Sequence, residues 1–110
     1  MNKITFFANG EPIHEFERSA ILEERQRGFL DKMDSDMEKG IRINGQLISN
    51  PQLQQRARFV ALNLLKALHQ DNHAVIGASS TWLAERKPNL IEVRYEQQAD
   101  GINVEFIETQ

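Results

Sequence analysis

The chain of 110 residues contains no cysteine, which excludes a disulfide framework, a zinc ribbon and thiol chemistry. Its longest apolar runs are only a few residues long, whereas a membrane-spanning helix needs about 20. Neither sign of charge dominates, because 13 basic residues stand against 16 acidic ones. This balance argues against a strongly cationic nucleic-acid binder and against a polyanionic tail. We therefore expect one soluble globular domain over residues 1–110.

The first residues carry no sign of a targeting segment. Met1-Asn2-Lys3 leads directly into an alternating, strand-like pattern and not into the apolar stretch of a signal peptide. We therefore expect a cytoplasmic protein that does not enter a membrane. A chain of this length typically buries about two-thirds of its unfolded surface, which is enough for a core without metals or disulfides.

Turn signals divide the chain into strand pairs. Three dipeptides each separate two short runs of strand-forming residues: Asn9-Gly10, Asn44-Gly45 and Asp100-Gly101. Asn-Gly and Asp-Gly supply the positive φ angles that tight hairpin turns require. The sequence therefore predicts three β-hairpins, one at each end of the chain and a small one at 41–48.

The register of the first hairpin follows from its turn. A two-residue loop between 3–8 and 11–16 places Phe6 opposite Ile13. Both faces of this hairpin carry apolar residues, so we expect both to be at least partly covered. Pro12 has no N–H to donate to a neighbouring strand, which predicts an edge position for this strand.

The register of the last hairpin follows from its alternation. Between 90–97 and 102–108, only a loop with an even number of residues sets apolar side chains opposite one another. The predicted register pairs Tyr95 with Val104. On the outer face it also pairs Arg94 with Glu105, a favourable combination of charges.

Three helical segments lie between the hairpins. The first, from about Ser19 to Lys39, has Ser19 as its predicted N-cap and Gly40 just beyond its end. Its narrow apolar stripe and charged remaining faces predict a surface helix. The second runs from Pro51 to about Gln70, with Asn50-Pro51 as its start signal.

The second helix is predicted to be the central core helix, because its apolar stripe is wide. The third segment, from about His73 to Lys87, has a helical pattern, although residues 74–78 also fit a short strand or loop. Trp82 is expected to be a core anchor, with an exposed stacking platform as the alternative.

These elements predict an α+β fold. The first and last hairpins are expected to join in one antiparallel sheet, with about three helices packed on one face and the small hairpin at 41–48 as an addition.

No pattern in the sequence satisfies the requirements of a metal site. His69 and His73 have the spacing of two ligands on one helix face, but no third ligand clusters with them and Asp71 suggests a helix break. The run from Asp34 to Gly40 lacks the glutamate that a calcium loop places at its twelfth position. We expect Asp34 and its acidic neighbours to form a solvated helix face, and we expect no metal and no cofactor.

One hydroxyl-rich stretch offers a candidate small-ligand site at Ser79, Ser80 and Thr81. It lacks the second glycine of a nucleophile elbow and the lysine of a phosphate loop, so helix capping or packing is the simpler interpretation. The alternative is a small-molecule-binding protein or enzyme whose site lies between sheet and helices and also includes His14 and Arg42.

The second helix carries apolar residues on two sides. Phe59 and Leu62 project away from its main stripe, among Gln55, Arg58 and Lys66. Either the first helix covers them within the same chain, or they form a surface for a partner, with apolar anchors and a basic rim.

The partner surface leads us to expect a non-catalytic protein–protein interaction or regulatory module, most simply a homodimer. The alternatives are the small-molecule binder or enzyme described above and a nucleic-acid-binding domain that uses Arg56, Arg58 and Lys66. The acidic outer face expected for the last hairpin opposes a nucleic-acid backbone.

Overall fold

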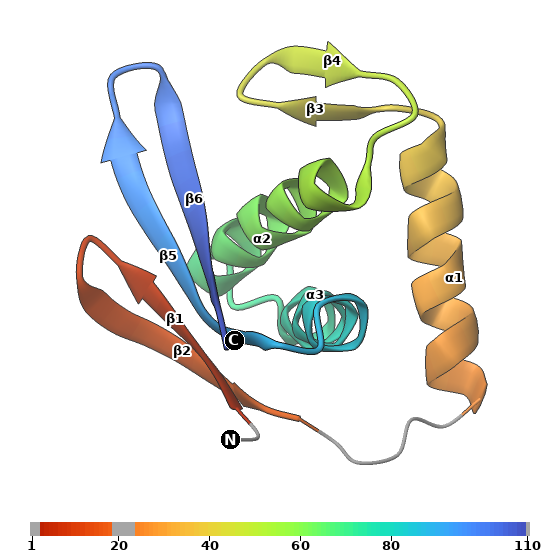
Figure 1. Ribbon diagram of the computed structural model, residues 1–110, viewed down its shortest axis with the longest axis horizontal. Helices are drawn as coiled ribbons and strands as arrows, with labels where there is room; N and C mark the ends of the chain where they lie inside the picture. Colours follow the sequence, from red (N-terminus) through yellow and green to blue (C-terminus); the bar gives the residue numbers. More distant parts are fainter. Residues whose placement is uncertain (1–2, 19–23, 110) are drawn as a thin grey trace.

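The computed structural model describes residues 3–18 and 24–109, in which helices separate three hairpins (Figure 1). In chain order the elements are β1 (Lys3–Ala8), β2 (Glu11–Glu17), α1 (Glu24–Glu38), β3 (Ile41–Ile43), β4 (Gln46–Ile48), α2 (Leu53–His69), α3 (His73–Arg86), β5 (Leu90–Gln98) and β6 (Gly101–Glu108). The α+β class and the three hairpins predicted from the sequence are confirmed. Residues 74–78 are helical, and Ser19 lies outside the described residues.

Two hairpins form the main sheet, in the strand order β2-β1-β5-β6, while β3 and β4 pair separately. Strands are antiparallel within each hairpin, but β1 and β5 run parallel at the centre, with Phe6 beside Val93. The sequence predicts antiparallel pairing between the two hairpins, and this prediction is wrong for β1 and β5. The parallel pair is feasible because the long connection from β2 to β5 passes through three helices, which bring the chain back to the same end of the sheet.

The predicted register of the first hairpin is wrong by one residue. Phe6 lies opposite His14 and not opposite Ile13, because a bulge interrupts the pairing between Phe6 and Phe7. The bulge leaves Ile13, next to Pro12, without a partner on β1. As a result, His14 faces the helices, while Ile13 is 38% exposed.

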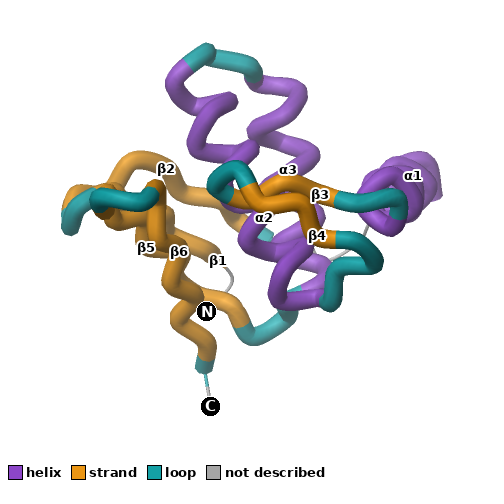
Figure 2. The backbone as a smooth tube through the Cα atoms, turned by 90° about the horizontal axis from the view of Figure 1, so that it is seen from above, coloured by secondary structure: helices purple, strands orange, loops and turns teal. Residues whose placement is uncertain are grey.

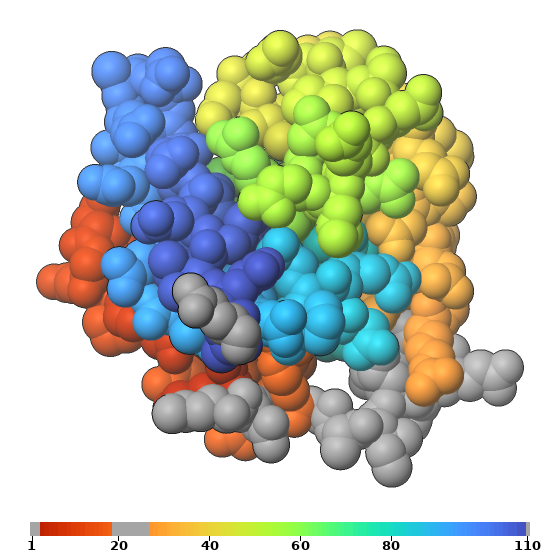
Figure 3. All heavy atoms as spheres, viewed as in Figure 1, coloured from red at the N-terminus to blue at the C-terminus, as the bar shows by residue number. Residues whose placement is uncertain are grey.

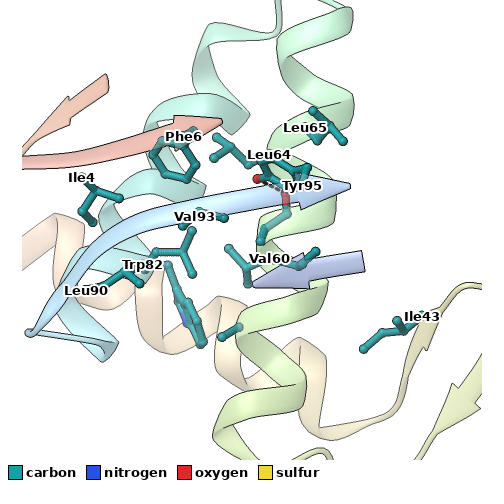
Figure 4. Packing of buried hydrophobic residues seen from close by; sticks show 14 of the residues in the cluster. Ile4, Phe6, Ile43, Val60, Leu64, Leu65, Trp82, Leu90, Val93 and Tyr95 are labelled. Atoms are coloured by element: carbon teal, nitrogen blue, oxygen red, sulfur yellow. Dashed lines mark hydrogen bonds between the residues drawn. The ribbon is translucent and has the colours of Figure 1, made fainter. Parts of the chain in front are cut away.

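The predicted register of the last hairpin is confirmed. Tyr95 lies opposite Val104, and Arg94 lies opposite Glu105. The Tyr95 hydroxyl donates a hydrogen bond of 2.6 Å to the carbonyl oxygen of Ala61 on α2 (Figure 4). Burial raises the pKa of Tyr95 above its usual value, so the phenol remains a donor.

All three described helices lie on the same side of the sheet. In Figures 1 and 2, α2 and α3 lie next to the sheet, and α1 lies beyond them as an outer layer. Figure 3 shows side chains filling the space between the sheet and α1 on the face it displays. None of the described helices lies over the opposite face of the sheet (Figure 1).

The core lies between the sheet and the α2–α3 pair. Figure 4 shows side chains from β1, α2 and α3 meeting over β5: Phe6, Val60, Leu64, Trp82 and Val93. Trp82 is completely buried, which confirms its predicted role as a core anchor. Burying large apolar side chains typically stabilises a fold by about 1.5–3 kcal/mol each.

Helix α2 begins two residues later than predicted. Its N-cap is Gln52, whose backbone N–H donates to Oε1 of Gln55 at 2.8 Å. Asn50, the predicted cap, instead adopts a positive φ of 48° in the preceding turn. Helix α3 begins as predicted, and Oδ1 of Asn72 accepts a hydrogen bond of 3.3 Å from the backbone N–H of Val75.

Arg18 connects the end of the first hairpin to the end of α3. Its guanidinium donates to the carbonyl oxygens of Ala84, Lys87 (3.0 Å) and Leu90 (2.7 Å). A cation at this position also interacts favourably with the negative end of the helix dipole. Nothing in the sequence singled out Arg18, because its partners lie more than 60 residues away along the chain.

Asp34 fixes α1 to the other two helices. Its carboxylate accepts hydrogen bonds from Nε1 of Trp82 (3.2 Å), a guanidinium N–H of Arg56 (3.2 Å) and Nε of Arg86 (3.0 Å). The side chain is only 21% exposed. The expectation of a solvated face is therefore wrong at Asp34. The reason is that its three partners come from elements 22 to 52 residues away.

We predict that Asp34→Asn lowers the free energy of unfolding by about 2–3 kcal/mol, because the partly buried Arg56 loses its carboxylate and Arg86 keeps only the exposed Asp31. Asp36→Asn is the matched control, since Asp36 makes an exposed pair with Lys32 on the same helix. It should cost about 0.5 kcal/mol or less. Urea denaturation measures both variants, and equal midpoints for the two would contradict the role assigned to Asp34.

Candidate functional site

The side of α2 predicted to meet a partner is partly covered within the chain. Phe59 and Leu62 are both half-buried and pack against the core cluster. Phe59 faces Met33 and Met37 of α1 across a small hollow of about 180 Å³. Phe59 therefore belongs to the surface of α2 against which α1 packs.

The polar residues of the predicted surface do not form one continuous site. The side chain of Gln55 accepts the hydrogen bond from the backbone of Gln52 at the N-terminus of α2. Arg58 is half-buried, whereas Lys66 is exposed and lies near the C-terminal end of the helix. Of the predicted set, Lys66 alone lies beside a larger recess.

That recess is a groove of about 460 Å³ between α1 and the α2–α3 hairpin, which we call the helix groove. Its lining is mainly apolar and includes Phe29, Met33, Lys66, Ala67, Val75 and Ala78. Figure 2 shows the α2–α3 hairpin, whose turn projects past the other elements, with α1 beside it.

Two large apolar side chains of the helix groove are exposed. Phe29 on α1 is 52% exposed, and Val75 on α3 is 37% exposed. The spacing of apolar residues places Phe29 on the apolar face of α1 and Val75 on that of α3. Periodicity shows that a residue lies on the apolar face of a helix. It does not show whether a neighbouring helix covers that residue.

The three hydroxyl residues pack and bond within α3. Ser79 and Ser80 are buried, and the hydroxyl of Thr81 donates to the carbonyl oxygen of Gly77 at 2.7 Å. This matches the capping or packing interpretation. Of these three residues, Ser79 alone lines the helix groove.

The structure brings His14 and Ser80 together, as the enzyme alternative required. Nε2 of His14 lies 3.3 Å from the hydroxyl oxygen of Ser80. Ser80, however, is completely buried, so a substrate has no access to its oxygen. Arg42 is exposed on the separate β3–β4 hairpin and takes no part in this pair. The pair therefore serves packing between β2 and α3.

The environment of His14 favours the neutral imidazole. The ring is partly buried, and its centroid lies 5.3 Å from that of Phe6. Burial lowers the pKa of His14 below its usual value, because the charged form loses hydration.

No group of three or more potential metal ligands occurs among the side chains described in residues 3–18 and 27–109. His69 ends α2 and His73 begins α3, and both are exposed. Between them Asp71 has a positive φ of 53°, which interrupts the helix as the sequence suggested. The two imidazoles therefore do not share one helix face.

Comparisons with known proteins leave the function to be argued from the geometry. The chain matches no protein-family model, no curated protein and no solved structure. None of the described helices combines the length and the apolar composition needed to span a membrane.

We predict that the stability of the wild type falls more steeply between pH 7.5 and about pH 5 than that of His14→Gln. The folded-state pKa of His14 is lowered. On acidification the unfolded chain therefore binds a proton near pH 6.5, before the folded chain does, and unfolding is favoured. Urea midpoints across this range measure the effect. Parallel profiles would contradict it, since all other titrating groups are common to both proteins.

Proposed function

We propose that this chain is a non-catalytic protein-interaction module that forms a homodimer through the helix groove. The observation that carries the proposal is the exposed apolar surface beside that groove. Phe29 and Val75 come from different helices and leave apolar surface in solvent at the same recess. Exposed apolar surface of this kind, next to a recess, is typical of interaction sites.

A second copy of the chain is the occupant that the chemistry favours. Charged residues make up 26% of the chain, yet Lys66 is the one charged side chain among the described groove residues. A nearly neutral, apolar surface is complementary to another of its kind, whereas a strongly charged partner would find no counter-charge. Depletion of charge is also a property of the centres of protein interfaces.

The shape of the patch also favours self-association. A two-fold interface uses the same patch on both subunits, so the patch must contain both a protruding and a receiving part. Phe29 is half-exposed at the edge of the groove, and the recess of about 460 Å³ lies beside it. In the proposed dimer, Phe29 of each protomer enters the groove of the other.

The non-catalytic part of the proposal rests on the buried state of Ser80. The hydroxyl that could pair with a general base, His14, has no exposed surface. Its neighbours Ser79 and Thr81 are committed to packing and to a hydrogen bond within α3.

We predict that the wild type is a dimer in sedimentation velocity at tens of micromolar and that Phe29→Glu is monomeric. Placing a carboxylate in the apolar contact carries a large desolvation cost. The control is Leu53→Glu, because Leu53 is 49% exposed outside the groove. This control should remain dimeric. A monomeric wild type contradicts the proposal, and so does a dimer that Phe29→Glu leaves intact while circular dichroism shows a native fold.

A further inference from the structure

We propose that the outer face of the sheet is a second interaction surface, which binds an arginine-containing basic segment of a partner protein. The inference does not depend on the homodimer, because the helices and the helix groove lie on the other side of the sheet (Figure 1).

The outer face carries an excess of negative charge. Its charged residues are Lys3, Glu15, Glu17, Glu92, Arg94, Glu96 and Glu105. Five glutamates and two bases leave this face with a net charge of −3, which equals the formal net charge of the whole chain. A field of one sign on an open surface attracts a partner of the opposite sign and repels a nucleic-acid backbone.

The two bases on this face are already paired. Lys3 lies 3.4 Å from a carboxylate oxygen of Glu15, and Arg94 lies 2.7 Å from one of Glu92. Glu96 and Glu105 make no ion pair in the part of the chain that the structure describes. These two carboxylates are therefore available to an incoming cation.

The two carboxylates lie at a hollow on the sheet. The hollow has a volume of about 460 Å³, and its lining includes Phe7, Asn9, Arg94, Glu96, Asn103 and Glu105. Phe7 contributes an aromatic ring, and the two asparagines contribute amide groups. An aromatic ring together with carboxylates is the combination that binds a guanidinium group.

Arg94 shows within the chain how this surface binds a guanidinium. Its guanidinium carbon lies 5.7 Å from the ring centroid of Phe7, while its terminal nitrogen contacts Glu92. A partner arginine would place its guanidinium on Glu96 and Glu105 and its apolar stem against the part of Phe7 that Arg94 does not contact. Lysine has a compact charge that stacks less well on a ring and cannot form the two-pronged contact, so arginine is preferred.

Fluorescence anisotropy with a labelled Gly-Arg repeat peptide tests the inference at low salt. We expect saturable binding that weakens as salt is added, and at least threefold weaker binding of the matched Gly-Lys peptide. The double variant Glu96→Gln/Glu105→Gln should weaken binding of the arginine peptide about tenfold. Phe7→Leu, which retains an apolar side chain, should reduce the preference for arginine over lysine.

The control is Glu38→Gln/Asp71→Asn, which removes the same charge from exposed positions away from the sheet. It should change the affinity less than twofold. If both double variants weaken binding equally, the loss of affinity depends only on the net charge of the protein, and the inference is overturned. Absence of binding at millimolar peptide, or equal affinity for the lysine peptide, would overturn it as well.

Discussion

The carboxylate of Asp34 holds the helical layers together. It accepts hydrogen bonds from Arg56 on α2 and from Trp82 and Arg86 on α3. Helix α1 lies one layer away from the sheet (Figure 1). These hydrogen bonds, together with apolar packing against α2 and α3, therefore determine its position. Because α1 forms one wall of the helix groove, the same carboxylate fixes the shape of the proposed interface. A structural ion pair and the proposed interface are thus linked through one side chain.

The two hairpins produce a sheet with two chemically different faces. Their inner face carries the apolar residues that meet α2 and α3, and their outer face carries five glutamates against two bases. The helix groove, in contrast, is nearly free of charge. Surfaces of such different character select different partners, since apolar surface favours a similar apolar surface and acidic surface favours a basic one. The two proposals together describe a connector between a second copy of the chain and a basic partner.

Local signals in the sequence were sufficient for the elements but not for their assembly. The turn dipeptides and the alternation in 90–108 predicted the hairpins and the register of Tyr95, because both depend on neighbouring residues. The parallel pairing of β1 with β5 joins strands that are distant in the sequence, and the bulge at Ile13 is an irregularity that the turn dipeptide does not specify. The role of Asp34 depends on arginines and a tryptophan from other helices. For the candidate site, the sequence named Lys66 but overlooked Phe29, because periodicity shows which residues share a face and not how far a partner covers it.

The central claim is that α1, held by Asp34, forms with the α2–α3 hairpin a surface on which two copies of the chain meet. Hydrogen exchange of the unmodified protein, followed by mass spectrometry at low and high protein concentration, tests it most directly. The account predicts that peptides from 27–38 and 63–80 gain protection as concentration rises, while those from β2 and β6 do not change. Protection that is independent of concentration in the helices, or that rises first at the sheet, would contradict it.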